Sequence, residues 1–243
     1  MEQIGKMGQE VLKQIQASEN FTVICGVDTL DSGNTLFPVY SNPNDIKEKP
    51  DVIIDFSVPA ATINIVKYAV QEKIPVVVAT TGFSSEELDL LKEYSKHLPI
   101  FRAANMSYET NIMADIISKL ATQLSDSDIE IVETHHNRKI DSPSGTALFL
   151  ADSINNALGN EMTYEYNRAA KKEKRSKKEI GIHSIRGGTV VGKHSVFFFG
   201  DNESFEISHT VDSRSVFAKG SLKAAQFIVN QPNGFYSMSD LIK

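Results

Sequence analysis

Residues 133–147, ETHHNRKIDSPSGTA, gather side chains that can move protons and bind anions. His135 and His136 stand together at the end of a predicted strand, so they project to opposite sides if the strand stays regular. One imidazole can face a bound ligand as a proton donor, while the other orients or binds that ligand. Lys139 adds a full positive charge between the histidines and the small polar residues that follow.

The run Ser144, Gly145 and Thr146 follows Pro143 at the predicted start of a helix. Free backbone N–H groups and the positive end of the helix dipole make such a turn an anion site. Gly145 permits close approach of the backbone to a ligand, and the hydroxyls of Ser144 and Thr146 can donate further hydrogen bonds. Together with Lys139, this turn suits a carboxylate or a phosphate.

Each of these features also has a plainer explanation. A Ser-Gly-Thr run before a helix is often only a cap, and histidines are often structural. Paired histidines can bind metal, but adjacent residues rarely reach one ion and no His-x-x-x-His follows, so no metal is predicted. The presence of both histidines, Lys139 and Asp141 in one short segment favours a ligand site.

The elements that must position these residues differ between the two parts of the chain. In the first part, strands are predicted at 21–28, 51–56 and 74–82, and helices at 7–16, 60–73 and 84–97. In the second part, helices are predicted at 110–124, 144–158 and 215–230, and strands at 128–136, 180–188, 189–200 and 204–211. The first order is typical of a parallel sheet with right-handed crossovers, and the second of an antiparallel or mixed sheet.

We therefore predict an α/β protein with two domains. A Rossmann-like dinucleotide-binding domain spans 1–108 with 215–243, and an α+β substrate-binding and oligomerisation domain with a mixed sheet spans 109–214. The aromatic run at 197–199 has more apolar surface than one sheet face and a helix are expected to bury. The second domain is therefore predicted to form an oligomer that covers it.

Composition excludes several classes of protein. The net charge of −6 argues against non-specific attraction to nucleic acid, and the single cysteine, Cys25, excludes an intrachain disulfide framework. The basic run at 169–179 has no interleaved aromatic residue and is interpreted as a solvated loop. No apolar run approaches the ~20 residues of a membrane span and no signal peptide is evident, so a cytoplasmic protein is expected.

The pattern Glu133-x-His135-His136-x-x-Lys139-x-Asp141-x-Pro143-Ser144-Gly145-Thr146-Ala147 resembles the signature of the dihydrodipicolinate reductase family. Further segments that carry the resemblance lie at 55–57, 79–83, 105–107, 182–188 and 213–218, and it extends from about Gly5 to the C-terminus. The resemblance implies reduction, by a hydride from NADH or NADPH, of the cyclic imine derived from 4-hydroxy-tetrahydrodipicolinate in lysine and diaminopimelate biosynthesis. It also implies a homotetramer.

The resemblance assigns roles to residues of the motif. It implies that His135 is the proton donor and that Lys139 binds substrate and takes part in proton delivery. The residues that would hold the carboxylates of the small dicarboxylate substrate are His136, Ser144, Gly145 and Thr146. The residues implied at the cofactor are Gly5, Lys6, Met7, Asp28, Phe56, Ser57, Ala79, Thr80, Thr81, Gly82, Asn105, Met106, Arg214 and Phe217.

The acid at Asp28 is the main indication of cofactor preference. Asp28 ends a predicted strand 20 residues beyond Gly8 and is placed to accept hydrogen bonds from ribose hydroxyls. An acid there repels a 2′-phosphate and favours NADH, although Lys6 is a cation that can attract one.

The N-terminal segment departs from the family pattern. Glu2 stands where the first glycine of the phosphate-binding loop is expected, and no strand precedes Gly5-Lys6-Met7-Gly8. A dinucleotide fold without this central strand is expected to bind nicotinamide cofactor poorly. The alternative to a reductase is therefore a dicarboxylate-binding protein with an impaired cofactor site; a metal-dependent hydrolase that uses the paired histidines is a more remote one.

Overall fold

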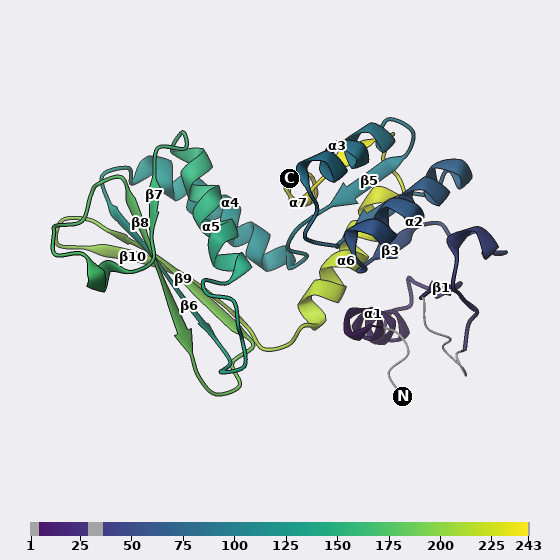
Figure 1. Cartoon of the computed structure of the whole chain (residues 1–243), viewed down its shortest axis with the longest axis horizontal. Helices are drawn as coiled ribbons and strands as arrows, with labels where there is room; N and C mark the ends of the chain where they lie inside the picture. The colour runs from purple at the N-terminus through teal and green to yellow at the C-terminus, as the bar shows by residue number, and fades with distance from the viewer. Residues whose placement is uncertain (1–4, 29–35, 243) are drawn as a thin grey trace. The chain divides into compact units, whose positions relative to one another are not determined.

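The computed structural model describes residues 5–28 and 36–242, and the position of Glu2 lies outside them. The chain divides into two compact units (Figure 1): unit 1 is Met1–Tyr108 with Arg214–Lys243, and unit 2 is Glu109–Ser213. Each unit has its own hydrophobic core.

Unit 1 is built on a four-stranded parallel sheet in the order β11-β5-β4-β3. The strands are β3 (Ile53–Asp55), β4 (Val76–Val78), β5 (Pro99–Arg102) and β11 (Gly234–Tyr236). The helices of this unit are α1 (Lys6–Gln16), α2 (Pro59–Glu72), α3 (Ser85–Tyr94), α6 (Ser215–Ile228) and α7 (Met238–Leu241). Val76 and Val78 pack with α2 and α3, whereas Val77 packs with α6, so helices cover both faces of the sheet. Burial on both faces explains the continuous apolar sequence of β4.

The N-terminal part of unit 1 differs from the prediction. Within the predicted strand 21–28, only β1 (Gly26–Val27) is strand, and it pairs with β2 (Val39–Tyr40) in a separate two-stranded sheet. A short 3-10 helix, η1 (Pro43–Asp45), follows β2. The prediction of a strand over 21–28 was therefore wrong in extent. β-Branched residues gave the segment a strand pattern, but a strand also needs a neighbour along its whole length.

The outer edge of β3 has no partner among the described strands. Ile53 and Asp55 bond toward β4, because the Ile53 N–H donates to Pro75 O (2.9 Å) and the Ala79 N–H donates to Asp55 O (2.8 Å). Strand geometry then directs the backbone groups of Ile54 to the opposite edge. The sheet thus stops at the side that borders the segment 20–28.

Unit 2 contains a five-stranded mixed sheet in the order β10-β9-β6-β8-β7. The strands are β6 (Asp128–His135), β7 (Thr163–Glu165), β8 (Glu179–Arg186), β9 (Gly192–Phe199) and β10 (Ser204–Val211). β6, β8 and β7 run parallel, while β9 is antiparallel to both β6 and β10. This arrangement confirms the predicted mixed sheet.

One face of the unit 2 sheet is covered by α4 (Tyr108–Gln123) and α5 (Gly145–Ala157), which lie side by side (Figure 1). Residues of β6 alternate between half-buried and buried, and Ile129 and Ile131 pack beneath the helices. The other face is open in this chain: Phe197 and Phe199 stack with ring centroids 5.6 Å apart, and Phe199 is 42% exposed. This face carries the aromatic surface that the sequence indicated.

The basic run at 169–179 begins in the 3-10 helix η2 (Arg168–Ala170) and continues as a loop to the start of β8, and many of its cations contact acids. Arg175 pairs with Asp128 and Glu130, and Lys171 pairs with Glu165. These pairs tie the loop to the sheet of unit 2. Across the described residues, no helix has both the length and the apolar character needed to cross a bilayer.

Candidate active site

Strand β6 places Glu133 and His135 on the same face, because they are two residues apart. Both are buried, at the end of the strand beyond Ile129 and Ile131. His136 follows the strand end and is half-buried. The adjacent histidines therefore occupy different surroundings, and His135 is the one that shares a face with a carboxylate.

The Glu133 carboxylate is fully buried and accepts hydrogen bonds from three directions. His135 Nδ1 donates to Oε2 (2.6 Å), and the Ser144 backbone N–H donates to Oε1 (3.1 Å). Arg186, at the end of β8, donates with both terminal nitrogens, at 2.7 Å to Oε2 and 2.6 Å to Oε1. Such a bidentate pair fixes the plane of the carboxylate.

These contacts keep Glu133 ionised. Burial by itself raises the pKa of Glu133, but hydrogen bonds from Arg186, Ser184 and His135 outweigh it and lower that pKa to about 2. The favourable charge of Arg186 acts in the same direction. At neutral pH Glu133 is therefore a hydrogen-bond acceptor only.

His194 on β9 lies beside His135, with ring centroids 5.2 Å apart in an edge-to-face arrangement. Burial, and then the positive charge of His135, lower the pKa of His194 to about 4, so this ring is neutral at pH 7. Its Nε2 lies 2.9 Å from Ser144 Oγ, which accepts from the Ala147 N–H at 3.1 Å. The Ser144 hydroxyl is therefore hydrogen-bonded both to the start of α5 and to the His194 ring.

The predicted anion turn is the N-terminus of α5. Ser144 is its N-cap and is buried. Its hydroxyl accepts from the Ala147 N–H and its own N–H donates to Glu133, so both groups are hydrogen-bonded within the protein. Gly145 is exposed, and a Cβ built on it would meet no atom within 4 Å. Gly145 and Thr146 open the helix, where backbone N–H groups lack intrahelical acceptors. The open space beside Gly145 is where a carboxylate can approach.

Lys139 and Asp141 lie in the loop between β6 and this turn, and Lys139 Nζ is 2.8 Å from Asp141 Oδ1. The hydrogen bond from Lys139 is the main reason that the pKa of Asp141 is lowered. Arg186 also donates to the Asp141 carbonyl (2.8 Å), which ties this loop to Glu133. His135, Ser144 and Arg186 thus contact the Glu133 carboxylate directly, and Asp141 and Lys139 are linked to it through Arg186.

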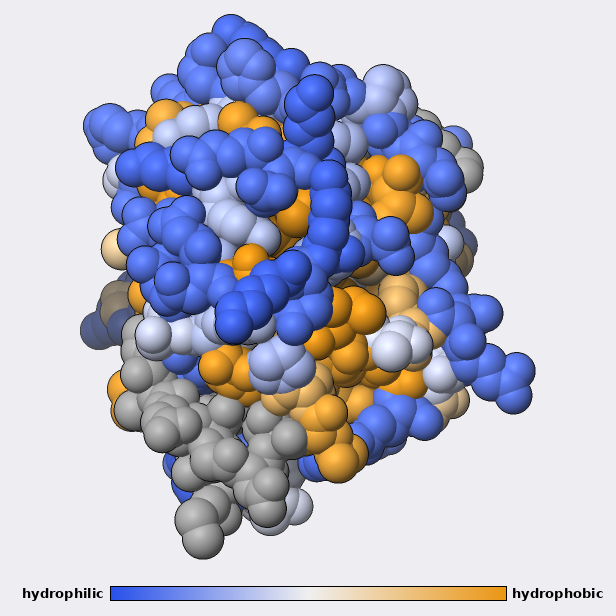
Figure 2. Space-filling model, turned by 90° about the vertical axis from the view of Figure 1, so that its right-hand side faces the viewer, coloured by the Kyte–Doolittle hydropathy of each residue, from blue (hydrophilic) through white to orange (hydrophobic). Residues whose placement is uncertain are grey.

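In unit 1, several of the residues predicted to bind cofactor line one cavity of about 1570 Å³. These residues are Gly5, Lys6, Met7, Asp28, Phe56 and Ser57. The cavity also extends along the edge of β3 that no described strand covers. Figure 2 views the chain from the end of unit 1 that carries β1 and shows apolar side chains exposed there. Among the exposed apolar residues, Ile24, Val27 and Val58 line the cavity.

A second predicted group lies at the ends of β3 and β4, where the buried Asp55 organises the loops. Asp55 accepts from the hydroxyls of Thr80 (2.9 Å) and Thr62 (2.5 Å) and from the Ser57 N–H (3.2 Å). Ala79 is buried and Thr81 and Gly82 are exposed, in the turn that follows β4, where Gly82 has a φ of +85°. Asp55 thus links the loop after β3 to the loop after β4 by hydrogen bonds.

The remaining predicted cofactor residues are not in the cavity lining. Asn105 accepts from the Ser107 N–H (2.9 Å), and Met106 is buried beneath Gly220 of α6. Arg214 is the N-cap of α6, and Phe217 packs against the core from its first turn.

The chain matches the family model described as dihydrodipicolinate reductase, N-terminus over residues 3–106, and the one described as dihydrodipicolinate reductase, C-terminus over residues 110–242. The chain belongs to the dihydrodipicolinate reductase family. This membership confirms the resemblance drawn from the sequence motifs.

Two curated relatives match over nearly the whole chain. A 4-hydroxy-tetrahydrodipicolinate reductase from Caldanaerobacter subterraneus is 51% identical over 98% of this chain and 95% of the relative. One from Clostridium tetani is 44% identical over 98% and 93%. The solved structure of a dipicolinate-bound dihydrodipicolinate reductase from Paenisporosarcina sp. TG-14 superposes with a TM-score of 0.81 at 25% identity, covering 96% of this chain and 94% of that one.

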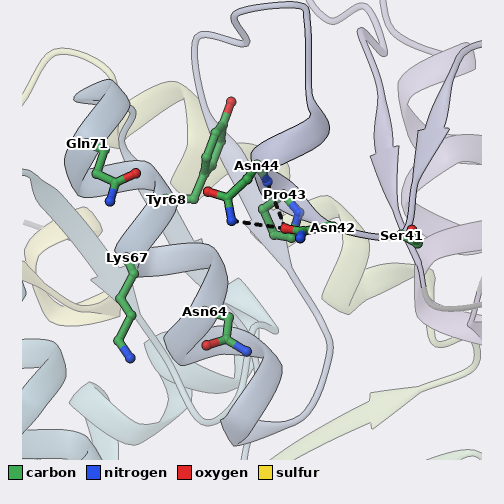
Figure 3. A pocket seen from close by; sticks show the side chains of 8 residues that line it. All are labelled: Ser41, Asn42, Pro43, Asn44, Asn64, Lys67, Tyr68 and Gln71. Atoms are coloured by element: carbon green, nitrogen blue, oxygen red, sulfur yellow. Dashed lines mark hydrogen bonds between the residues drawn. The ribbon is translucent and has the colours of Figure 1, made fainter.

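A further cavity of this family member, of about 510 Å³, lies between η1 and α2 (Figure 3). Its lining is Ser41, Asn42, Pro43, Asn44, Asn64, Lys67, Tyr68 and Gln71, none of which the sequence singled out. Asn42 accepts there from both the backbone and the side chain of Asn44. Within residues 5–28 and 36–242, no cluster of histidine, cysteine and carboxylate side chains has the arrangement of a metal site.

Three members of the unit 2 cluster were not assigned a role from the sequence: Glu133, Arg186 and His194. Glu133 stood in the motif, and its spacing of two from His135 on a strand was a usable signal. Arg186 and His194 depend on pairing, because β8 places Arg186 opposite His135 and β9 places His194 opposite Glu133.

Proposed function

We propose that this chain reduces the cyclic imine derived from 4-hydroxy-tetrahydrodipicolinate to tetrahydrodipicolinate, with NADH or NADPH as reductant. The observation that carries the proposal is 51% identity to a 4-hydroxy-tetrahydrodipicolinate reductase over 98% of the chain. The chemistry of unit 2 supports it, because a ring that can carry a proton lies in the same cluster as an anion-binding turn.

For the substrate, the proposal assigns its carboxylates to cations and backbone dipoles of unit 2. Gly145 and Thr146 offer N–H groups at the start of α5, and Lys139 and His136 add side chains. Ser144 contributes mainly as the cap that shapes this turn, because its hydroxyl already bonds within the protein. Asp141 holds Lys139 in the loop.

The reaction adds one hydride and one proton across a conjugated double bond. The reduced nicotinamide supplies the hydride when it is bound. His135 is proposed to donate the proton to the electron-rich carbon that remains, with Lys139 assisting, and to regain a proton from solvent afterwards. Hydride and proton together account for the two hydrogens gained by the product.

For the cofactor, the residues that line the large cavity of unit 1 fit a dinucleotide. The start of α1 has no side-chain cap at Gly5 and therefore offers N–H groups and a positive dipole end to phosphates. Lys6 adds a cation, and Asp28 is proposed to accept from ribose hydroxyls, which favours NADH. Unit 1 is thus the proposed cofactor domain and unit 2 the substrate domain.

The open face of the unit 2 sheet supports assembly as a homotetramer. Phe197 and Phe199 form a stacked apolar pair on this face, of the kind that oligomer interfaces cover. Light scattering of the purified protein measures the stoichiometry, and Phe199→Glu is expected to lower it. A monomeric wild-type protein would contradict this part of the proposal.

Loss of NADH absorbance with freshly generated substrate tests the reaction. The competing candidate, a dicarboxylate-binding protein with an impaired cofactor site, is favoured by one observation: the cavity runs along an edge of β3 that no described strand covers. Calorimetry with dipicolinate separates the two. Binding of dipicolinate without any turnover of NADH or NADPH would support the second candidate.

A further inference from the structure

The Glu133 carboxylate has no use of its own in the chemistry proposed above. It is fully buried, and its oxygens are already bonded to His135, Arg186 and Ser144. Burying a carboxylate is unfavourable unless charged and hydrogen-bonding partners compensate for it. A group that is this enclosed cannot touch a substrate, so any effect on turnover must pass through a neighbour.

The neighbour that matters is His135, because the contact fixes which ring nitrogen holds a proton. An ionised carboxylate only accepts hydrogen bonds, so the 2.6 Å contact requires a proton on His135 Nδ1. Nε2 is then the nitrogen that can exchange a proton with another molecule. Arg186 holds the carboxylate by both oxygens, which prevents it from turning away from the ring.

The other surroundings of His135 leave this assignment intact. His194 from β9 is neutral, and its Nε2 bonds to Ser144 rather than to His135. Lys139 and Asp141, from the loop after β6, form an ion pair with each other. His209 on β10 lies 3.5 Å from the hydroxyl of Thr110 on α4. Of these groups, only Glu133 is hydrogen-bonded to the His135 ring in the described structure.

We propose that Glu133, clamped by Arg186, is a positioning residue that fixes the orientation and tautomer of His135 so that Nε2 delivers the proton. This inference rests on the proposed function, since it concerns the same proton transfer. It adds two residues, on two strands, on which that transfer depends. His135 remains the group that reacts.

The test compares Glu133→Gln with a matched control on the same strand. A glutamine has one acceptor oxygen, so it cannot satisfy both Arg186 and His135 Nδ1 as the carboxylate does. We expect kcat to fall by about 100-fold or more while KM for the substrate changes little. Glu133→Asp, which keeps the charge, is expected to recover part of kcat.

The control is Glu130→Gln. Glu130 is three residues earlier on β6 and also binds a histidine and an arginine: His183 Nε2 at 2.7 Å and Arg175 at 3.2 Å. Its loss removes the same kinds of contact at a site without a link to His135. We expect Glu130→Gln to retain wild-type kcat, which separates positioning of His135 from a general effect of losing an acid on β6 that binds a histidine and an arginine.

A spectroscopic readout makes the inference independent of turnover. In protein with ¹⁵N-labelled histidine, the His135 ring in its neutral form should carry its proton on Nδ1, and Glu133→Gln should shift this toward Nε2. If Glu133→Gln does not fold, the double variant Glu133→Gln/Arg186→Gln removes both buried charges and is used in its place. Its kcat is expected to be as low.

The outcomes are distinct. Wild-type protein with no reductase activity but an Nδ1–H ring would remove the proposed function and leave the geometry standing. If the wild-type protein is active, either of two results would overturn the positioning role: a Glu133→Gln variant with wild-type kcat, or a neutral His135 ring that carries its proton on Nε2.

Discussion

Gly192 is the residue against which the His135 ring packs, and its replacement tests how tightly that ring must be placed. A Cβ built on Gly192 would lie 3.1 Å from Nε2 of His135, closer than an ordinary contact, so one of the two must move by a few tenths of an ångström. The ring cannot easily retreat, because Nδ1 is held at 2.6 Å by Glu133. Gly192 has no positive φ, so alanine there brings no backbone strain.

The expected size of the effect follows from this displacement. A misplacement of about 1 Å at a catalytic group can cost about 100-fold in rate, so a few tenths of an ångström should lower kcat by about 3- to 10-fold in Gly192→Ala. Steady-state reductase assays measure kcat and KM, and thermal unfolding checks that the fold is retained. Gly200→Ala is the control, because it lies just beyond the other end of β9 and a Cβ there meets only atoms at ordinary distances of 3.7 Å or more. A Gly192→Ala enzyme with wild-type kcat would refute the claim that the ring position is critical.

Three further predictions concern the same two units. His135→Ala should lower kcat by about 10²- to 10⁴-fold with little change in substrate affinity, whereas Lys139→Ala should impair both; unchanged turnover in His135→Ala would remove the proton-donor role. Acid should lower the free energy of unfolding, measured by urea denaturation, in two steps. Because the pKa of His194 is lowered in the folded protein, the first step runs from about pH 6.5 to about pH 4. Because the pKa of Glu133 is also lowered, the second runs from about pH 4.5 to about pH 2, and each step amounts to ~3 kcal/mol. His194→Gln should remove the upper step, and a flat profile between pH 6.5 and 4 in the wild type would contradict the assignment. Calorimetric titration of NADH should show binding with a dissociation constant in the low micromolar range or below, because the lining of the unit 1 cavity fits a dinucleotide; weak or absent binding would instead support the candidate with an impaired cofactor site.

Local patterns in the sequence predicted the elements that carry the candidate site. The alternation over 128–136 predicted β6 to within one residue, and Ser144 before a helical pattern predicted the cap of α5. The strand and the helix cap depend on residues close together in the chain, so they can be predicted from a single sequence. The motif then indicated the family, which the full-length matches confirmed.

Features that depend on strand pairing were less predictable. The short strands β5 and β11 were missed, because three or four residues carry too little pattern and gain stability only from their neighbours in the sheet. The strand predicted at 21–28 failed for the converse reason: its pattern was present, but among the described residues only Gly26 and Val27 have a strand partner. Arg186 and His194 reach the site only through the register of β8 and β9 with β6.

One face of β6 carries both core residues and residues of the candidate site, at the alternate positions 129, 131, 133 and 135. Ile129 and Ile131 are buried against the helices, and Glu133 and His135 continue the same face into the polar cluster. The burial that stabilises the first pair also removes water from the second, so the carboxylate at 133 requires Arg186 and the imidazole at 135 requires Glu133. The alternation that makes the strand fold therefore also makes the histidine depend on a fixed acid, and a change to either partner should alter proton transfer before it alters substrate binding.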